Sequence, residues 1–379
     1  MQIPFNKPYF TGKEIVFIKE VFENGKIGGD GIFTKKCNSF FEQKYGFKKV
    51  LLTTSCTDAL EMVAILLNIK EGDEVIMPSY TFVSSANPFI LRGAKIIFTD
   101  SLPNHPNMNV KDLEKLITKR TKVIVPVHYA GMACDMDEIM KIANQNNIFV
   151  VEDAAQAIDS YYKNKPLGGI GHLAAFSFHE TKNIVSGEGG MLVINDDQFI
   201  ERAEIIREKG TNRSKFFRGE VDKYGWVDIG SSFLPSDMIA AFLYAQCLSL
   251  DIIQNRRKIL WNAYYEKLKH LQDENLIQLP QLPVSSTNNA HMFYLVCKNL
   301  KERTGLIQIL KNNNITSVFH YISLHNSSYF EKQHNGRDLP NADNYTNCLL
   351  RLPLYYELDL ESVNRICTII TDYYMRVSS

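Results

Sequence analysis

The feature that most constrains this chain is the regular alternation of short apolar segments with helical patterns in its N-terminal half. The apolar segments are KKVLLTT (48–54), DEVIMP (73–78), AKIIFTD (94–100), TKVIVPVH (121–128) and IFVVEDAAQ (148–156), and the helical patterns between them cover 55–69, 79–93, 110–120 and 136–147. Continuous apolar strands that alternate with helices are typical of a parallel sheet covered on both faces. We therefore expect an α/β fold that binds its ligands beyond the carboxyl ends of the strands.

The pattern changes after about residue 248. A long amphipathic helix is predicted over 249–276. It is followed by the segment HMFYLVCK (291–298), a helical pattern at 300–314, the segment ITSVFHY (315–321) and a last helical pattern at 360–376. We predict a large domain over residues 1–248 and a smaller C-terminal α+β domain over residues 249–379.

Composition excludes several classes of protein. The chain has 42 basic and 42 acidic residues, so its zero net charge does not favour nucleic acid as a partner. The N-terminal segment MQIPFNKPYF is unlike a secretion signal, and no apolar run is long enough to span a membrane. The seven cysteines include no CxxC pair, which predicts reduced thiols in a cytoplasmic protein without a metal site.

Two polar residues lie where apolar strands are expected to end. Asp153 ends one apolar segment, and Ser177 ends the segment LAAFSF (173–178) shortly before Lys182. If both strands lie in one sheet, the carboxylate and the amine can face the same crevice. Pyridoxal phosphate (PLP) requires this pair, because a lysine holds it as a Schiff base and an acidic partner keeps its ring nitrogen protonated. The pair predicts a PLP site in which Lys182 and Asp153 are catalytic.

The phosphate of PLP needs oriented hydrogen-bond donors. The segment TTSCTDALE opens a helix that is apolar nearly all round, and the N-terminus of a buried helix binds anions through its free N–H groups and its dipole. Ser55 or Thr57 can cap this helix and reach the phosphate with a hydroxyl, and Ser177 can add another donor. Phe82, from the segment SYTF, can stack on the cofactor ring.

Each residue alone also has a simpler interpretation. A lysine after a strand is usually solvated, and Asp153, Ser55 and Thr57 could each be a helix cap and nothing more. The GEGG segment (187–190) could be a tight turn. Three histidines could be hydrogen-bonded structural residues: His179, His320 and His325.

Taken together, the motifs resemble a known family. The resemblance is carried by TTSCTDALEMVAILL, GDEVIMPSYTFVSSANPFILRGAK, VIVPVHYAGMACDMDEIM, VVEDAAQA, FSFHETKNIVSGEGGMLVIND and MFYLV with FHYISLH. These segments are similar to the PLP-dependent sugar-nucleotide aminotransferases of the DegT/StrS type. The resemblance covers nearly the whole chain. It implies PLP fold type I, which is aspartate-aminotransferase-like, with a mostly parallel seven-stranded sheet flanked by helices and a smaller C-terminal α+β domain. It also implies a homodimer with active sites at the subunit interface.

The resemblance assigns roles residue by residue. Lys182 would be the Schiff-base lysine, Asp153 the partner of the ring nitrogen, Gln156 the hydrogen-bond donor to the phenolic oxygen and Phe82 the stacking residue. Four residues would surround the phosphate: Ser55, Cys56, Thr57 and Ser177. Many members place an asparagine where this chain has Ser232, in GSSFL, and use it on the neighbouring subunit's phosphate.

Within the family, the chain is most similar to the branch that makes dTDP-4-amino-4,6-dideoxygalactose for enterobacterial common antigen. The similarity lies in HETKN (179–183), residues 207–232 and LLRLPLYY (349–356). That similarity implies transfer of an amino group from L-glutamate to C4 of dTDP-4-dehydro-6-deoxy-D-glucose. The serine pair in GSSFL is shared by this branch. Further candidates for holding the sugar and its diphosphate are His179, Lys209, Arg213, His320 and Tyr321.

Four different functions compete with this interpretation. The same keto sugar could give the gluco amine, because no single residue decides the C4 configuration. A sugar 3-dehydratase of the family would have histidine in place of Lys182, and a non-catalytic regulator should have lost Lys182 or Asp153. A nicotinamide dehydrogenase would need GxGxxG at the first strand-to-helix turn, where TTSCTDAL has no glycine.

Overall fold

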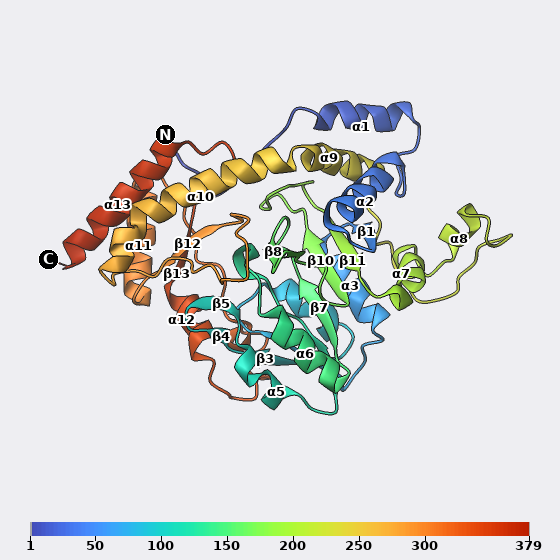
Figure 1. Ribbon diagram of the computed structural model, residues 1–379, viewed down its shortest axis with the longest axis horizontal. Helices are drawn as coiled ribbons and strands as arrows, with labels where there is room; N and C mark the ends of the chain where they lie inside the picture. The colour runs from blue at the N-terminus through green and yellow to red at the C-terminus, as the bar shows by residue number, and fades with distance from the viewer. Residues whose placement is uncertain (1, 379) are drawn as a thin grey trace.

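A central sheet organises the molecule, and the computed structural model describes residues 2–378. Within these residues the sheet has seven strands (Figure 1). In spatial order they are β1 (Lys49–Thr53), β11 (Gly190–Ile194), β10 (Leu173–Ser177), β7 (Phe149–Asp153), β6 (Thr121–Ile124), β2 (Glu74–Pro78) and β3 (Lys95–Thr99). Only β11 runs antiparallel to its neighbours, β1 and β10. The α/β fold with a mostly parallel seven-stranded sheet is therefore confirmed.

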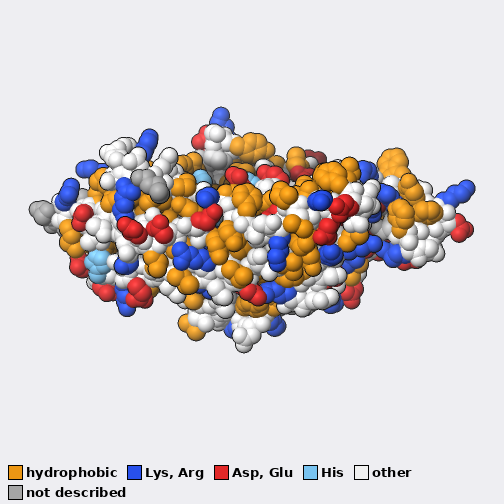
Figure 2. Space-filling model, turned by 90° about the horizontal axis from the view of Figure 1, so that it is seen from above, with side chains coloured by type: hydrophobic (Ala, Val, Ile, Leu, Met, Phe, Trp, Pro, Cys, Tyr) orange, Lys and Arg blue, Asp and Glu red, His pale blue; other side chains and the backbone are white. Residues whose placement is uncertain are grey.

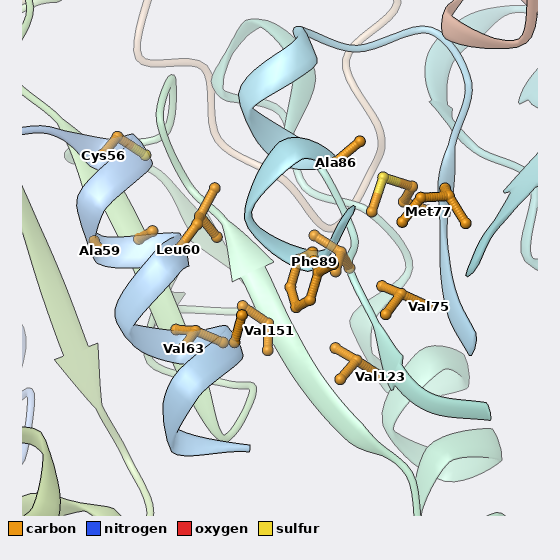
Figure 3. Packing of buried hydrophobic residues seen from close by; sticks show 14 of the residues in the cluster. Cys56, Ala59, Leu60, Val63, Val75, Met77, Ala86, Phe89, Val123 and Val151 are labelled. Atoms are coloured by element: carbon orange, nitrogen blue, oxygen red, sulfur yellow. The ribbon is translucent and has the colours of Figure 1, made fainter. Parts of the chain in front are cut away.

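Helices cover both faces of the sheet because successive strand residues point to opposite sides. In β6 and just beyond it, Val123 and Val125 join one hydrophobic cluster, whereas Ile124 joins the other. Figure 3 shows the first cluster, in which Val123 and Val151 lie on the same side as Leu60 and Phe89. Helices α3 (Cys56–Leu66), α4 (Asn87–Ile90) and α7 (Ile200–Arg207) cover this face, and α1 (Glu14–Glu23), α2 (Ile32–Tyr45), α5 (Leu113–Leu116), α6 (Met136–Asn146) and α9 (Asp237–Leu248) lie on the other.

The long helix α10 (Leu250–Asp273) runs from the end of α9 to the C-terminal part of the chain (Figure 1). Its apolar face packs against a small sheet and the last helices in a third cluster, which also includes Ile3. The division of the chain into two domains near residue 248 stays a prediction. The first residues lie with the C-terminal part, since Ile3 pairs with Ile315. The other elements here are β12 (Phe293–Val296), α11 (Leu300–Asn312), α12 (Pro340–Cys348), β13 (Leu349–Leu352) and α13 (Leu360–Ser378).

Two helices expected from the sequence are much shorter in the structure. Residues 79–93 form a 3-10 turn (Val83–Ser85) and the short α4, because Pro88 cannot donate an intrahelical bond and is tolerated only at a helix start. Residues 110–120 form a 3-10 turn (Val110–Asp112) and the short α5. The chain leaves the helix there because the Thr118 hydroxyl donates to Glu74 at 2.5 Å.

Smaller elements complete the fold. Residues 208–231, called the arm below, project from the sheet and carry α8 (Arg213–Phe217), at the right in Figures 1 and 2. Figure 2 shows basic and acidic side chains interspersed over the face in view, without a large area of one sign. Of the described helices, none has the length and hydropathy needed to cross a membrane. The two short ribbons are β4 (Ser101–Leu102) with β5 (His105–Met108), and β8 (Tyr161–Tyr162) with β9 (Lys165–Pro166).

A buried carboxylate fixes the strand β7 to the loop that follows it in the chain. Glu152 is fully buried and accepts N–H bonds from Gly168 (2.7 Å), Ile170 (2.8 Å) and Gly171 (2.6 Å). Its remaining partner is His128, with Nε2 3.0 Å from a carboxylate oxygen. Burial opposes ionisation, but His128 and the backbone donors hold the pKa of Glu152 below its usual value. Glu152 therefore fixes the end of β7, where the next residue is Asp153.

Substitution of Glu152 tests this anchor. Glu152→Ala should lower the free energy of unfolding by about 3 kcal/mol, because it strands His128 and three backbone N–H groups without an acceptor. Urea denaturation at neutral pH measures the effect. Glu138→Ala is the control, since the Glu138 carboxylate pairs with Lys141 on the surface of α6 and with no other cation among residues 2–378. Equal stability of the two variants would show that Glu152 is not an anchor.

Candidate active site

The strand ends bring together the residues that the sequence predicted, beginning with Asp153 at the end of β7. Its side chain is buried and accepts hydrogen bonds from the Ser85 hydroxyl (2.6 Å) and the Ala155 N–H (3.1 Å). The Ser85 hydroxyl is itself buried, in contact with that of Thr81 at 2.8 Å. These contacts hold the carboxylate in one orientation at the carboxyl ends of the strands, the region called the crevice below, although they use only part of its capacity as an acceptor.

Lys182 lies in the turn after β10, within electrostatic reach of Asp153 and Cys56. The ammonium group of Lys182 makes no hydrogen bond or ion pair with any residue that the structure describes. Burial, together with the positive charge of Arg351, lowers the pKa of Lys182 to about 8, against the opposing effects of Cys56 and Asp153. A desolvated amine of this kind is a good nucleophile and base near neutral pH.

The N-terminus of α3 faces the same crevice. Ser55 caps this helix, accepting the Asp58 N–H at 3.0 Å. The N–H groups of Cys56 and Thr57 open the helix and have no acceptor within residues 2–378. Free N–H groups at a buried helix N-terminus form an anion site. The free N–H groups are suited to a phosphate, whose binding here stays a prediction.

Gly190 sets how closely the helix N-terminus approaches the sheet. It is the first residue of β11 and lies opposite both Thr53 of β1 and Ser177 of β10. A Cβ atom at this position would collide with the backbone of Ser55 and Cys56. Close packing therefore requires glycine at position 190, whereas Gly187 has the positive φ (82°) that the tight-turn interpretation of GEGG predicts.

Gln156, Phe82 and Tyr321 form one side of the crevice. The Gln156 side chain accepts the Ala130 N–H at 2.7 Å and donates to the Tyr321 hydroxyl at 3.1 Å. The Phe82 ring is half exposed, and its centroid lies 5.8 Å from that of Tyr321. An exposed aromatic face is available for stacking, so the geometry agrees with the expected place of the cofactor ring. The individual roles stay predictions.

The candidates for substrate binding are more dispersed. His320 stacks beside Tyr321 at 5.8 Å, whereas His179 pairs with Glu188 at 3.7 Å. Lys209 and Arg213 lie exposed on the arm, and the Arg213 guanidinium lies over Phe217. Ser232 is exposed at the base of the arm, next to Phe233, whose carbonyl accepts the Thr54 N–H just before α3. Among the described residues, none of these candidates forms a side-chain hydrogen bond or ion pair with Lys182; His179 meets it only through its backbone carbonyl, which accepts the Lys182 N–H at 2.9 Å.

Sequence reasoning missed two residues near the crevice. Arg351 is buried on β13 and acts electrostatically on Lys182. His291 is buried next to Lys182, with Nδ1 2.8 Å from the amide oxygen of Asn183. A lone arginine inside the apolar run LLRLPL was a usable signal for Arg351. The segment HMFYLV gave no such signal for His291, because a histidine at the start of a strand is common.

A parallel sheet that directs an unpaired lysine, a fixed carboxylate and a free helix N-terminus into one crevice defines a PLP-dependent enzyme of fold type I. The profile of the DegT/DnrJ/EryC1/StrS aminotransferase family matches residues 9–371. The chain belongs to this family.

Several known proteins are similar over nearly their whole length. The spore coat polysaccharide biosynthesis protein SpsC of Bacillus subtilis is 32% identical over 384 residues, covering 98% of this chain and 96% of that protein. The uncharacterized protein MJ1066 of Methanocaldococcus jannaschii is 34% identical over 351 residues, covering 89% and 90%. The PLP form of the putative sugar aminotransferase Spr1654 from Streptococcus pneumoniae superposes with a TM-score of 0.91 at 26% identity, covering all of both chains. The aminotransferase TlmJ from Streptoalloteichus hindustanus gives 0.90 at 25%, covering 100% and 99%.

The chain is therefore a PLP-dependent sugar aminotransferase. Spr1654 is also known in a pyridoxamine phosphate (PMP) form, with a TM-score of 0.91 at 25% identity. When bound, PLP accepts the amino group of the donor and stabilises the carbanion formed at the donor's Cα. Lys182 would hold it covalently, Asp153 would pair with its ring nitrogen, and the start of α3 would bind its phosphate.

The low pKa of Lys182 predicts how the cofactor-free protein recaptures PLP. Only the neutral amine attacks the aldehyde, so the rate should rise with pH through about 8, where Lys182 loses its proton. Stopped-flow measurement of the visible absorbance of the lysine-bound cofactor gives this profile. A midpoint near the ordinary lysine value of about 10.4 would show that Lys182 is solvated. Circular dichroism at each pH excludes unfolding as the cause.

Proposed function

We propose that this enzyme transfers the amino group of L-glutamate to C4 of dTDP-4-dehydro-6-deoxy-D-glucose, giving dTDP-4-amino-4,6-dideoxy-D-galactose and 2-oxoglutarate. The observation that carries the aminotransferase chemistry is the unpaired Lys182 amine close to the fixed Asp153 carboxylate. The choice of sugar is supported by the similarity of HETKN, residues 207–232 and LLRLPLYY to one branch of the family. The name of SpsC supports a role in making a surface polysaccharide, such as enterobacterial common antigen or an O-antigen.

Lys182 is the proposed base in both halves of the reaction. After release by the amino donor, its amine takes the Cα proton of glutamate, and in the second half it delivers a proton to C4 of the sugar. Asp153 keeps the ring nitrogen protonated, so that the ring can accept electrons. The Gln156 amide, which donates to the Tyr321 hydroxyl in the structure, would donate instead to the phenolic oxygen of the cofactor. Phe82 would pack on the face of the cofactor ring. Four residues complete the phosphate site: Ser55, Cys56, Thr57 and Ser177.

The arm is the proposed contact region for a second copy of the chain and for the nucleotide. Phe217 and Trp226 are 69% and 84% exposed there, which favours burial in a homodimer. Lys209 and Arg213 add positive charge suited to a diphosphate. Ser232, at the base of the arm, would lie at the interface close to the partner's phosphate site. His179, His320 and Tyr321 are the proposed contacts of the sugar.

The competing product is the gluco-configured amine, which requires protonation of C4 from the opposite face of the sugar. The residues of the site do not support a dehydratase or a non-catalytic regulator. A 3-dehydratase of this family would have histidine at position 182, and a non-catalytic relative would have no use for a half-buried, unpaired Lys182 beside a fixed Asp153.

Substitution of Asp153 tests the catalytic pair. Asp153→Asn should lower turnover by at least about 100-fold, because a neutral amide cannot hold the ring nitrogen in its charged form. The control is Lys182→Ala, which should lose all turnover and the visible absorbance of the lysine-bound cofactor while unfolding at a similar temperature. Product formation from L-glutamate and the keto sugar is followed by chromatography. Unchanged turnover of Asp153→Asn would exclude this role.

The configuration of the product tests the proposed sugar chemistry. Purified protein is incubated with PLP, L-glutamate and dTDP-4-dehydro-6-deoxy-D-glucose, and the coupling between sugar H3 and H4 is read by proton NMR. A small coupling means an axial amine and the galacto product that we propose. A large coupling means the gluco product, which would keep the amino transfer and overturn the stereochemistry.

A further inference from the structure

Asn183, the residue after Lys182, is buried, and its side chain has three hydrogen-bond partners. The amide nitrogen Nδ2 donates to Gln254 Oε1 at 2.7 Å and to the Asn289 carbonyl oxygen at 2.9 Å. The amide oxygen Oδ1 lies 2.8 Å from His291 Nδ1. Gln254 lies on α10, and the other two partners precede β12. One side chain therefore fixes the turn that carries Lys182 to the C-terminal part of the chain.

The turn itself, residues 179–187, contains no helix or strand. Its backbone hydrogen bonds are local, such as those from the Lys182 N–H to the His179 carbonyl and from the Glu180 N–H to the Gly187 carbonyl, each 2.9 Å long. A polar contact with a distant residue, from Asn6 to the Glu180 carbonyl at 3.0 Å, is exposed. The contacts of Asn183 are buried and lie directly beside Lys182, so they determine where the lysine side chain starts.

The orientation of the Asn183 amide follows from its partners. A backbone carbonyl can only accept, so the atom next to the Asn289 carbonyl is the amide nitrogen. The remaining atom is the oxygen, and His291 Nδ1 must carry the proton that it accepts. Burial and the nearby positive charges, that of Lys182 first, hold the pKa of His291 well below its usual value, so the imidazole is neutral. His291 is thus fixed in one tautomer, as a donor to Asn183.

Asn289 extends this network to the proposed cofactor contact Gln156. The Asn289 side chain is fully buried, and its Nδ2 donates to the Gln156 carbonyl oxygen at 2.8 Å. A Cβ atom on Gly131 would overlap the Asn289 amide, so glycine leaves the space that this side chain occupies. Hydrogen bonds of Asn289 therefore connect the residue after Lys182 to the backbone of Gln156.

We propose that Asn183 is a positioning residue for Lys182, whose amine it aims at the aldehyde of the cofactor. This inference rests on the proposed function, in which Lys182 holds PLP. Contacts with His291 and Asn289 fix the backbone beside Lys182, so that its long side chain starts from one place and in one direction. The link through Asn289 also sets the position of the amine relative to Gln156, so that both reach the same cofactor ring.

The competing interpretation is that Asn183 only stabilises the fold, and Asn195 offers a matched control. The Asn195 Nδ2 also donates to two backbone carbonyls, those of Gly168 (2.9 Å) and Gly171 (2.8 Å). Asn195 follows the last residue of β11, whereas the first residue of that strand, Gly190, lies at the crevice. Asn195→Ala therefore removes the same kind of hydrogen bonds at the opposite edge of the sheet.

Capture of PLP by the cofactor-free protein separates position from stability. In Asn183→Ala the rate at high pH, followed by the visible absorbance of the lysine-bound cofactor, should fall at least about tenfold, because a small displacement of a reacting group costs much of the rate. The pH midpoint of capture should not move, because the charges around Lys182 are unchanged. Affinity for PMP, measured by calorimetry, should change by less than about threefold, since PMP has no aldehyde to bond with Lys182. Asn195→Ala should lose similar stability and keep the rate of capture.

Two substitutions of His291 provide a rescue. His291→Leu removes the donor to Asn183 and should slow capture by a similar factor. His291→Asn places an amide N–H where the imidazole has Nδ1, so it should recover most of that loss. If Asn183→Ala does not fold, the two His291 variants carry the test.

Several results would overturn the inference. They are equal slowing by Asn183→Ala and Asn195→Ala, a pH midpoint in Asn183→Ala near the ordinary lysine value, an equal loss of PMP affinity and PLP capture in that variant, or capture as slow in His291→Asn as in His291→Leu. A visible absorbance that persists in Lys182→Ala would instead reject the proposed function, because another residue would then hold the cofactor.

Discussion

The carboxylate of Asp153, held almost out of water at the end of β7, is the constraint on which the rest of the site depends. A buried charge of this kind is stable only if neighbouring groups compensate it. Ser85 and the Ala155 N–H do so in part. Strand alternation places the preceding residue, Glu152, on the opposite side, where His128 and three backbone N–H groups anchor it. One short strand therefore carries two buried acids, one that fixes the fold and one that remains available to the cofactor.

A second dependence links the sheet to α3, the helix proposed to bind the phosphate. The antiparallel strand β11 begins at the catalytic edge, and its first residue, Gly190, lies against the backbone of Ser55 and Cys56. This close contact sets the height of the α3 N-terminus relative to Ser177. The hydrogen bond from Thr57 to Ser84, 2.9 Å long, ties the same helix turn to the segment that holds Asp153. The proposed phosphate site and the proposed ring site are thus connected by close packing and hydrogen bonds, which a precisely oriented cofactor requires.

Much of this arrangement could be predicted from the sequence, because alternating apolar strands fix where the strands end. That rule alone predicts where Asp153, Ser177 and Lys182 lie. The rule fails where tertiary contacts decide: Pro88 shortens one expected helix and Thr118, bound to Glu74, ends another. It also fails for Arg351, which comes from a different sheet and reaches the crevice only through the packing of the C-terminal segment. No local pattern could show that its guanidinium lacks an acid, since that depends on every surrounding element.

The charges of the crevice form a coherent set. The positive charge of Arg351 disfavours the protonated form of Lys182, which is one reason, after the effect of burial, why the pKa of Lys182 falls to about 8. The carboxylate of Asp153 acts in the opposite direction, because a nearby negative charge favours the protonated amine. The balance of these effects leaves part of Lys182 neutral near physiological pH. A neutral amine is the form that can attack an aldehyde or accept a proton, so the same charges that surround Lys182 also determine the pH range in which it can react.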